Sequence, residues 1–294
     1  TIGKAEPRLM TKFDTRESLP VPLQNRGLFI LPIKNGVYQL IPGDGYHDLE
    51  PVPSPQQFLS RLSFTLYGAR RGISEAQYLN HAYNTGLLEH FLSTTPLHLT
   101  IQGRKVSTSF SFRVGSYQLH VDGVQIEVDA GFESPNELIL IEGKVRRSPT
   151  GNFIIRQLFY PYRDWQEILR KEPVSKEVIP LFFVYDSAQH TFNFWRYTFS
   201  DPDDYLSIQL QECKSYVLVE DPELQRRFRE SAFQPFQTTE KPPTIIPQAD
   251  RLDKVIALVF LVANGINNSA AIAQQLGFTR RQSSYYRNAA EALG

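Results

Sequence analysis

The sequence predicts an α/β fold in which a mixed β-sheet core is flanked by helices. Two consecutive apolar runs, residues 138–141 and 178–185, are typical of strands buried on both faces of a sheet. Stretches with helical spacing precede and separate these runs, which is the order expected of an α/β fold. A proline-rich stretch at residues 233–249 then separates the core from a short helical end.

The overall composition is that of a globular protein with a substantial core. The chain has 294 residues, of which 41% are hydrophobic, and its formal net charge is zero. A balanced charge neither predicts nor excludes binding to nucleic acid. A single cysteine excludes an intramolecular disulfide and a cysteine-rich zinc site. Because the sequence contains neither a membrane-length apolar run nor a signal-peptide core, we expect a cytoplasmic protein with no membrane partner.

Residues 1–68 are predicted to form a β-rich N-terminal region. Two β-prone runs, residues 27–33 and 37–41, flank the dipeptide Asn35-Gly36, which is typical of hairpin turns. Residues 56–66 have some helical spacing instead. The sequence leaves open whether this region contacts a ligand or only supports the core.

Residues 69–232 are predicted to form the α/β domain itself. Ser74 is a typical N-cap for a helix that runs to about Leu92. A second helix is expected to begin at Phe153 and to bend near Pro161. Strands are expected at residues 103–112, 117–121, 125–133, 137–144, 178–185, 192–199 and 215–219.

Three charged residues lie on two adjacent predicted strands. Asp129 is on the first strand, while Glu142 and Lys144 end the second and share one side of the sheet. Burying such charges is costly, but bound Mg²⁺ and a phosphate would offset the cost. Carboxylates can hold one or two Mg²⁺ ions that activate water, and a lysine can orient that water. The alternative is a solvated strand end with an ordinary Glu–Lys ion pair.

Further ligands for such a metal are available on the same strands. The main-chain carbonyl of Gly143 lies between the last two charged residues, and Glu127 shares the strand face of Asp129. On the following helix, Gln157 could hydrogen-bond the carboxylates or a water, and Arg156 and Arg163 could contact phosphates. The six histidines have no metal-ligand spacing, so we expect no histidine metal site.

The spacing of Asp129, Glu142 and Lys144 resembles that of the PD-(D/E)xK nuclease superfamily, with Val128 in place of the usual proline. Four segments also resemble one group of type II restriction endonucleases, namely residues 74–78, 103–104 together with 110–112, 125–133 and 156–163. The resemblance covers roughly residues 10–220. It implies a restriction-endonuclease-like core that cleaves duplex DNA with Mg²⁺, using the two carboxylates as metal ligands and the lysine at the attacking water.

The same resemblance implies further roles and partners. In related nucleases a glutamine on the helix after the active strands supports the site, which matches Gln157. An acidic residue on the preceding helix often adds a ligand, which matches Glu75, although Glu75 could be only a capping acid. Cutting both strands needs two active sites, so we expect a homodimer or dimerisation on DNA. A cognate DNA methyltransferase is expected in the same prokaryotic system.

Residues 250–294 are predicted to form a helix-turn-helix domain that resembles winged-helix domains. Residues 270–277 fit its first helix, with the turn at Gly277, although the sequence stops at Gly294, where a wing should begin. The residues expected to contact DNA on the second helix are Thr279, Arg280, Arg281, Gln282, Tyr285 and Asn288. A three-helix module that binds another protein is the alternative.

The sequence therefore predicts a type II restriction endonuclease. Metal-activated water would attack the scissile phosphate in line and leave 5′-phosphate and 3′-hydroxyl ends. One alternative is a structure-specific or repair nuclease with the same core. Another is a DNA-binding regulator in which the nuclease fold is inert.

Overall fold

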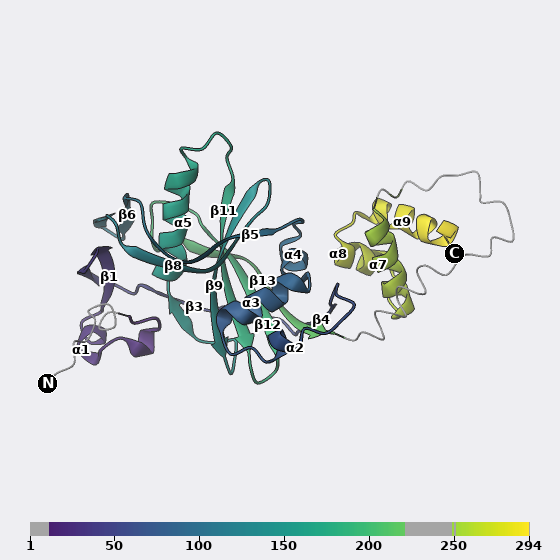
Figure 1. Cartoon of the computed structure of the whole chain (residues 1–294), viewed down its shortest axis with the longest axis horizontal. Coiled ribbons are helices and arrows are strands. Elements are labelled where there is room, and N and C mark those ends of the chain that lie inside the picture. The colour runs from purple at the N-terminus through teal and green to yellow at the C-terminus, as the bar shows by residue number, and fades with distance from the viewer. Residues whose placement is uncertain (1–11, 221–248, 250, 294) are drawn as a thin grey trace. The chain divides into compact units, whose positions relative to one another are not determined.

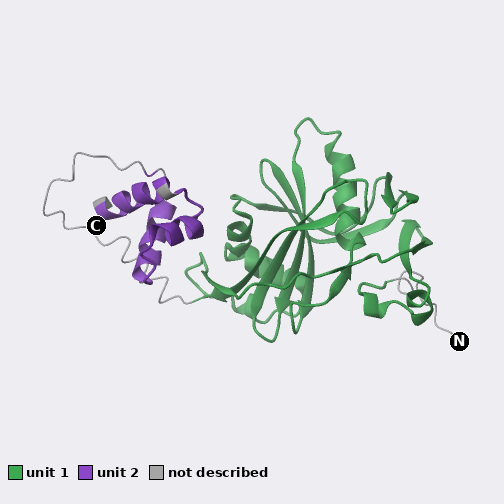
Figure 2. Ribbon diagram, turned by 180° about the vertical axis from the view of Figure 1, so that it is seen from behind, with its two compact units in different colours: residues 1–221 green, residues 222–294 purple. Residues whose placement is uncertain are grey.

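The computed structural model describes residues 12–220, 249 and 251–293, with the backbone alone described at residues 280, 292 and 293. The chain divides into two compact units, residues 1–221 and 222–294 (Figure 2). Apart from Ala249, the proline-rich linker predicted at residues 233–249 lies outside the described residues. Among the described residues, no helix combines the length and apolar character that crossing a membrane requires.

A seven-stranded mixed sheet forms the centre of the first unit (Figure 1). Its strands, in spatial order, are β4 (Gln56–Leu59), β13 (Ile208–Val219), β12 (Thr191–Phe199), β11 (Glu177–Asp186), β9 (Glu137–Arg146), β8 (Gln125–Glu133) and β5 (His98–Val106). β9 pairs with β11 in parallel, as β13 does with β4, whereas the other pairs are antiparallel. The predicted α/β class with a mixed sheet is confirmed.

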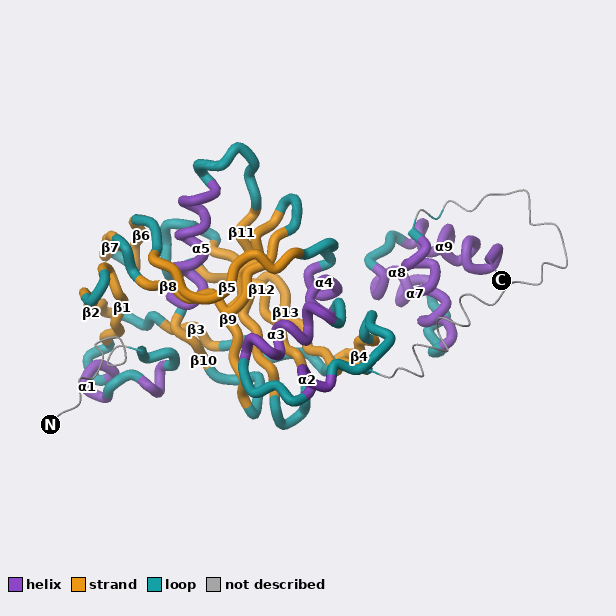
Figure 3. The backbone as a smooth tube through the Cα atoms, in the orientation of Figure 1, coloured by secondary structure: helices purple, strands orange, loops and turns teal. Residues whose placement is uncertain are grey.

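Helices cover both faces of this sheet, because alternate residues of a strand point to opposite sides. On β9, Leu138 and Leu140 pack in the same core cluster as α5 (Arg156–Leu169). Ile139 and Ile141 pack on the other face, in the cluster that contains α3 (Glu75–Asn84) and α4 (Leu87–Leu92). Figure 3 shows the strands in the centre of this unit with these helices around them. The consecutive apolar residues of β9 are therefore explained by burial on two sides.

The N-terminal region belongs to the same compact unit as the sheet. A hairpin of β1 (Leu28–Lys34) and β2 (Val37–Pro42) turns at Asn35 and Gly36, as predicted. After it, β3 (Tyr46–Asp48) pairs with β10 (Asn152–Ile154), and β4 forms one edge of the main sheet. The described part of this region also contains three short helical turns, namely η1 (Arg16–Ser18), α1 (Val21–Gln24) and α2 (Tyr67–Arg70).

Several local predictions were wrong, two of them because long-range pairing decided the outcome. The single helix predicted from Ser74 to about Leu92 is divided into α3 and α4 at Gly86, whose φ is 84°. Residues 56–59 form strand β4 instead of helix, because they pair with β13 from far along the chain. Residues 152–154 form β10 and pair with β3, so the following helix begins at Arg156 rather than Phe153. The strand predicted at residues 103–112 is divided between β5 and a second ribbon, made of β6 (Phe110–Val114) and β7 (Tyr117–Val121).

The second unit contains three described helices, α7 (Leu252–Ala263), α8 (Ser269–Leu276) and α9 (Arg280–Leu293). Its core includes Val255, Leu258, Ile272 and Tyr286, and the ring of Phe278 stacks on Tyr286. α8 ends at Gly277, whose φ of 65° lies in the left-handed region that favours glycine. The turn predicted at Gly277 is thus present.

Candidate active site

Asp129 and Glu142 meet where strands β8 and β9 separate. The ladder between these strands pairs Ala130 with Ile141, so Asp129 and Glu142 face each other one residue further along. The main-chain N–H of Gly143 donates a hydrogen bond of 2.8 Å to Asp129 Oδ2. The two carboxylates predicted as metal ligands are therefore brought together by strand register.

Lys144 and Gln157 both donate to one oxygen of Glu142. The Lys144 ammonium donates to Glu142 Oε1, and Gln157 Nε2 from α5 donates to the same atom at 2.5 Å. Among the described residues, Gln157 Oε1 is buried without a hydrogen-bond partner. The contact predicted between Gln157 and a site carboxylate is thus present. The other polar atom of the Gln157 side chain, Oε1, is available to a ligand or water.

Burial controls the charge state of these groups. Glu142 is only 7% exposed, and its burial, together with the nearby negative charge of Asp129, raises its pKa to about 7 despite the opposing charge of Lys144. Burial also raises the pKa of Asp129, against the hydrogen bond from Gly143. For Lys144, burial acts to lower the pKa, but the charge and hydrogen bond of Glu142 outweigh it and raise the pKa. A bound cation would favour the ionised carboxylates.

The absence of a side chain at Gly143 brings helix α3 against the site. A Cβ atom there would lie 3.1 Å from Glu75 Cβ and 3.3 Å from Leu79 Cδ1, which is tight for both contacts. Glu75 occupies the first turn of α3, next to the N-cap Ser74, whose reciprocal capping pattern with Gln77 is present. The position of Glu75 therefore suits both expectations, a site acid and a residue of the first turn.

The charged residues line one cavity of about 630 Å³. Its acidic residues are Asp14, Glu75, Glu127, Asp129 and Glu142, and its basic residues are Lys12, Lys34, Arg104, Lys144 and Arg156. Glu127 pairs with Arg104 at 3.1 Å, and both side chains are about half exposed. The cavity thus combines carboxylates that suit a cation with basic groups that suit phosphates.

Asp14 is a member of this cavity that sequence reasoning missed. Its Oδ1 is buried without a hydrogen-bond partner among the described residues and lies 4.0 Å from Arg156 Nη2. Its negative charge contributes to raising the pKa of both Glu142 and Lys144. No local signal marks Asp14, because the pairing of β3 with β10 and a hydrogen bond from the Ile154 N–H to its carbonyl place it there.

The oxygen atoms present suit Mg²⁺ better than a softer metal. Among the described residues, no three His, Cys, Asp or Glu side chains group closely enough to bind a metal ion alone. Mg²⁺ usually keeps several waters and takes only one or two carboxylates. Asp129, Glu142 and the Gly143 carbonyl are all oxygen donors, and the buried atom Gln157 Oε1 beside them lacks a partner among the described residues. This arrangement fits a partly hydrated Mg²⁺ ion.

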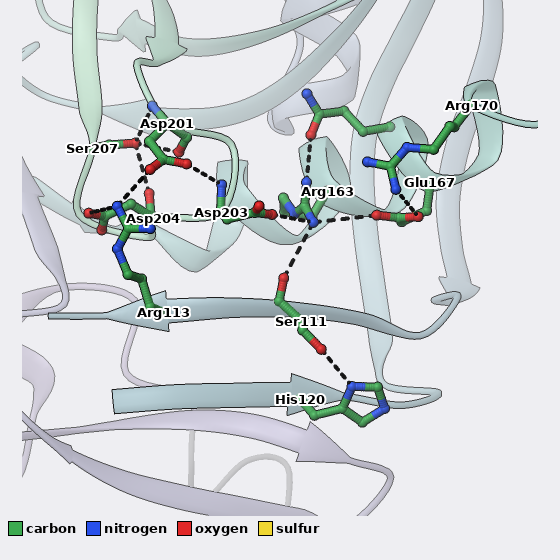
Figure 4. A network of polar contacts seen from close by, with 11 residues as sticks. Ser111, Arg113, His120, Arg163, Glu167, Arg170, Asp201, Asp203, Asp204 and Ser207 are labelled. Atoms are coloured by element: carbon green, nitrogen blue, oxygen red, sulfur yellow. Dashed lines mark hydrogen bonds and ion pairs between the residues drawn. The ribbon is translucent and has the colours of Figure 1, made fainter. Parts of the chain in front are cut away.

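Arg163, which was predicted to contact DNA, is buried and paired within the fold. Its side chain is only 4% exposed, and Nη2 lies 2.8 Å from Asp203 Oδ1 and 3.4 Å from Glu167 Oε1. Nη2 also donates to the carbonyl of Ser111 (Figure 4). Arg163 therefore ties α5 to strand β6 and to the turn between β12 and β13. By contrast, Arg156 lines the cavity, and its contact with a phosphate stays a prediction.

The candidate DNA contacts of the second unit are partly engaged in local structure. The Gln282 N–H donates to Thr279 Oγ1 at 3.2 Å, and the Thr279 N–H donates to Gln282 Oε1 at 2.9 Å, so these residues cap α9. Arg281 Nε donates to the hydroxyl of Tyr285 at 2.6 Å. Asn288 is exposed, while the side chain of Arg280 lies outside the description.

The chain belongs to a family described as a domain of unknown function, DUF6997, which matches residues 41–217. A second domain of unknown function, DUF6996, matches residues 1–40. No curated protein and no solved structure matches the chain. The first match contains Asp129, Glu142, Lys144 and Gln157, whereas Asp14 and Lys34 of the cavity fall within the second.

Proposed function

We propose that the chain is a type II restriction endonuclease that hydrolyses phosphodiester bonds at specific sequences in duplex DNA, with Mg²⁺ as its cofactor. The observation that carries this proposal is the convergence of Asp129, Glu142 and Lys144 at one cavity from two neighbouring strands. A restriction-endonuclease-like core of the PD-(D/E)xK superfamily is part of the same proposal. The products would carry 5′-phosphate ends.

Each residue of the site has a distinct role in this proposal. Asp129, Glu142 and the Gly143 carbonyl would hold Mg²⁺, which supplies activation of a water molecule and stabilisation of the leaving oxyanion. The ammonium of Lys144 orients the attacking water and offsets the negative charge of the scissile phosphate. Gln157 fixes the orientation of Glu142 through its 2.5 Å hydrogen bond.

The charge distribution around the cavity supports a nucleic-acid substrate. Lys12, Lys34, Arg104 and Arg156 surround the carboxylates, although the chain as a whole has no net charge. Basic groups placed in this way bind phosphates on either side of the reacting bond. A neutral total charge is compatible with this, because the few basic side chains that line the cavity are offset by acidic residues there and elsewhere in the chain.

The second unit is proposed as a helix-turn-helix, winged-helix-like domain that contacts DNA. The support is the short turn at Gly277 between α8 and α9 and the exposed polar residues of α9, Arg281, Gln282 and Asn288. Double-strand cutting further requires a homodimer or dimerisation on DNA. A cognate DNA methyltransferase in the same prokaryotic cytoplasm would protect the host sites.

Digestion of a mixed-sequence plasmid with the full chain and Mg²⁺ tests the proposal. Discrete bands, with 5′-phosphate ends found by run-off sequencing, are the expected result. A smear, or cutting only at branched junctions, would instead indicate a repair nuclease with the same core. Binding without any cutting would indicate an inert regulator. The matched control is the variant Asp129→Asn, which keeps the shape of the side chain and removes its charge.

A further inference from the structure

The tip of the β1–β2 hairpin forms part of the wall of the cavity that contains the carboxylates. Lys34, Asn35, Gly36 and Tyr38 all line this cavity. The two strands pair from Leu28 with Pro42 up to Lys34 with Val37, so the tip is the closed end of a two-stranded ribbon. The sequence alone left open whether this region contacts a ligand, and its position now argues that it does.

The ribbon is held at several points behind its tip. The hydroxyl of Tyr160 on α5 donates to the Pro32 carbonyl at 2.9 Å, and the Asp122 N–H donates to the Ile33 carbonyl at 2.9 Å. Phe29 and Leu31 are buried in the core of the first unit. The hairpin therefore presents its tip at the cavity from a fixed base, which lowers the entropy cost of contacting a ligand.

The polar side chains at the tip make few contacts within the described part of the fold. Among the described residues, the side chains of Asn35 and Tyr38 have no hydrogen-bond partner, although both residues line the cavity. Lys34 lies 4.0 Å from Asp122, and both side chains are more than half exposed, so this ion pair is weak and exchangeable. By contrast, Tyr160 at the same cavity has its hydroxyl engaged.

We propose that the β1–β2 hairpin enters the major groove of duplex DNA beside the scissile phosphate and reads sequence there. The inference rests on the proposed function for its substrate. The major groove is wide enough to admit a two-stranded ribbon. The carboxamide of Asn35 offers a donor and an acceptor to a base edge, the pairing best suited to adenine, and the ammonium of Lys34 neutralises a phosphate.

A simpler role for Asn35 has to be separated from this one, because Asn-Gly is typical of hairpin turns for conformational reasons alone. Asn35→Asp makes the separation, since Asp-Gly favours the same turns. The substitution replaces the amide donor by a negative charge, which DNA repels. Tyr38→Phe removes a hydroxyl and keeps the ring. Gln39→Ala is the matched control, because Gln39 is an exposed amide on the same ribbon that does not line the cavity.

The experiment uses the full chain with Lys144→Ala as a non-cutting background and a duplex DNA pool of randomised sequence. Sequences bound by the parent are selected first, and the affinity of each variant for them is then measured at several salt concentrations. Asn35→Asp should lower affinity for the selected sequence by at least about fivefold and relax the preference at one or two positions. Lys34→Ala should weaken binding to all sequences by the same factor, and it should reduce the slope of log K against log salt by about 0.9.

The possible outcomes separate the two proposals. If the parent selects a sequence and Asn35→Asp and Tyr38→Phe keep both its affinity and its preference, the hairpin does not read DNA, while the proposed endonuclease stands. If the parent chain binds no duplex and wild type cuts none, the proposed function fails and the inference fails with it. Thermal unfolding of each variant completes the test. If Asn35→Asp unfolds at the same temperature as Gln39→Ala but has lost its sequence preference, the loss is due to a missing DNA contact and not to unfolding.

Discussion

The main-chain amide of Gly143 is hydrogen-bonded to Asp129 Oδ2 at 2.8 Å, beyond the last ladder pair of β8 and β9. This contact fixes one oxygen of Asp129 against the strand that carries Glu142 and Lys144. The other oxygen atoms of the two carboxylates are then the natural ligands for a cation. The register of β8 against β9 therefore places the two carboxylates together. A substitution at Asp129, Glu142 or Gly143 should disturb this arrangement.

Removing either the carboxylate of Asp129 or the ammonium of Lys144 should abolish DNA cutting while DNA binding survives. Asp129→Ala removes a proposed metal ligand, and Lys144→Ala removes the group proposed to orient the attacking water, so we expect activity to fall by at least about a hundredfold. Plasmid cleavage and the fluorescence anisotropy of a labelled duplex measure the two properties separately. Retained cleavage in either variant would refute the site assignment.

Gly143→Ala should lower both stability and cutting. The added Cβ would lie 3.1 Å from Glu75 Cβ and 3.3 Å from Leu79 Cδ1, so helix α3 would have to shift. Overpacking of this kind costs about 1–3 kcal/mol, which urea unfolding can measure. Gly68→Ala is the control, because a Cβ at Gly68 meets no atom within 4 Å. Equal unfolding midpoints for the two variants would contradict the close packing of α3 on β9.

Gln157→Ala should reduce cutting by about 10- to 100-fold through its effect on Glu142. Gln157 is a positioning residue, since it acts by donating to Glu142 Oε1. We therefore expect a weaker apparent affinity for Mg²⁺, measured by titrating the cleavage rate with the metal. Gln118→Ala, at an exposed position on β7, is the control. An unchanged Mg²⁺ dependence in Gln157→Ala would mean that the hydrogen bond does not organise the site.

The stability of the first unit should fall in acid in a way that depends on Glu50. His47 Nε2 lies 3.0 Å from Glu50 Oε1, and the Tyr197 hydroxyl donates to Glu50 Oε2 at 2.7 Å. Burial acts to raise the pKa of Glu50, but these hydrogen bonds outweigh it and lower the pKa below its ordinary value of 4.5. A lowered pKa stabilises the folded state above the ordinary pKa, and this stability is lost as the pH falls through the folded-state pKa.

Glu50→Gln should remove that pH dependence. The difference between wild type and variant in the free energy of unfolding, measured by urea unfolding, should be larger at pH 7 than at an acidic pH below the lowered pKa of the folded-state carboxylate. The exposed residue Glu172 provides the control Glu172→Gln. If Glu50→Gln keeps the full wild-type loss of stability between the two pH values, the carboxylate is not the group responsible.

The sequence was most informative where short-range patterns determine the outcome. The consecutive apolar residues of β9 and β11 marked the buried strands, and the hairpin at Asn35 and Gly36 followed from turn chemistry. The proximity of Asp129 to Glu142 was predicted by placing two strands that are adjacent in sequence side by side in the sheet. These features need only neighbouring residues, or strands that are adjacent in sequence.

Long-range features of the fold and site escaped prediction for a physical reason. Residues 56–59 are a strand because β13, about 160 residues later, supplies their hydrogen-bond partners. Asp14 reaches the cavity through the pairing of β3 with β10, which no local pattern records. The Asn35 hairpin was predicted as a local structure, but its place at the cavity was not. Tertiary contacts decide which exposed loops become part of a site.

Arg163 gives the clearest contrast between the sequence pattern and the structure, and it yields a prediction about stability. It lies on the same helix as Arg156, yet its guanidinium is 4% exposed and pairs with Asp203 and Glu167. Arg163→Met should destabilise the first unit by about 1–3 kcal/mol, because the buried guanidinium loses its hydrogen bonds to Ser111 and Glu167, while the pair with the largely exposed Asp203 contributes little. Urea unfolding checks this value.

The same variant also separates a structural role of Arg163 from DNA contact. If the Arg163→Met variant is still folded, its duplex binding should depend on salt as wild-type binding does. Loss of a phosphate contact would instead reduce the slope of log K against log salt by about 0.9. Arg156→Met is the matched comparison, since Arg156 lines the cavity and is proposed to contact a phosphate. A reduced slope in Arg163→Met with normal stability would restore Arg163 as a DNA contact.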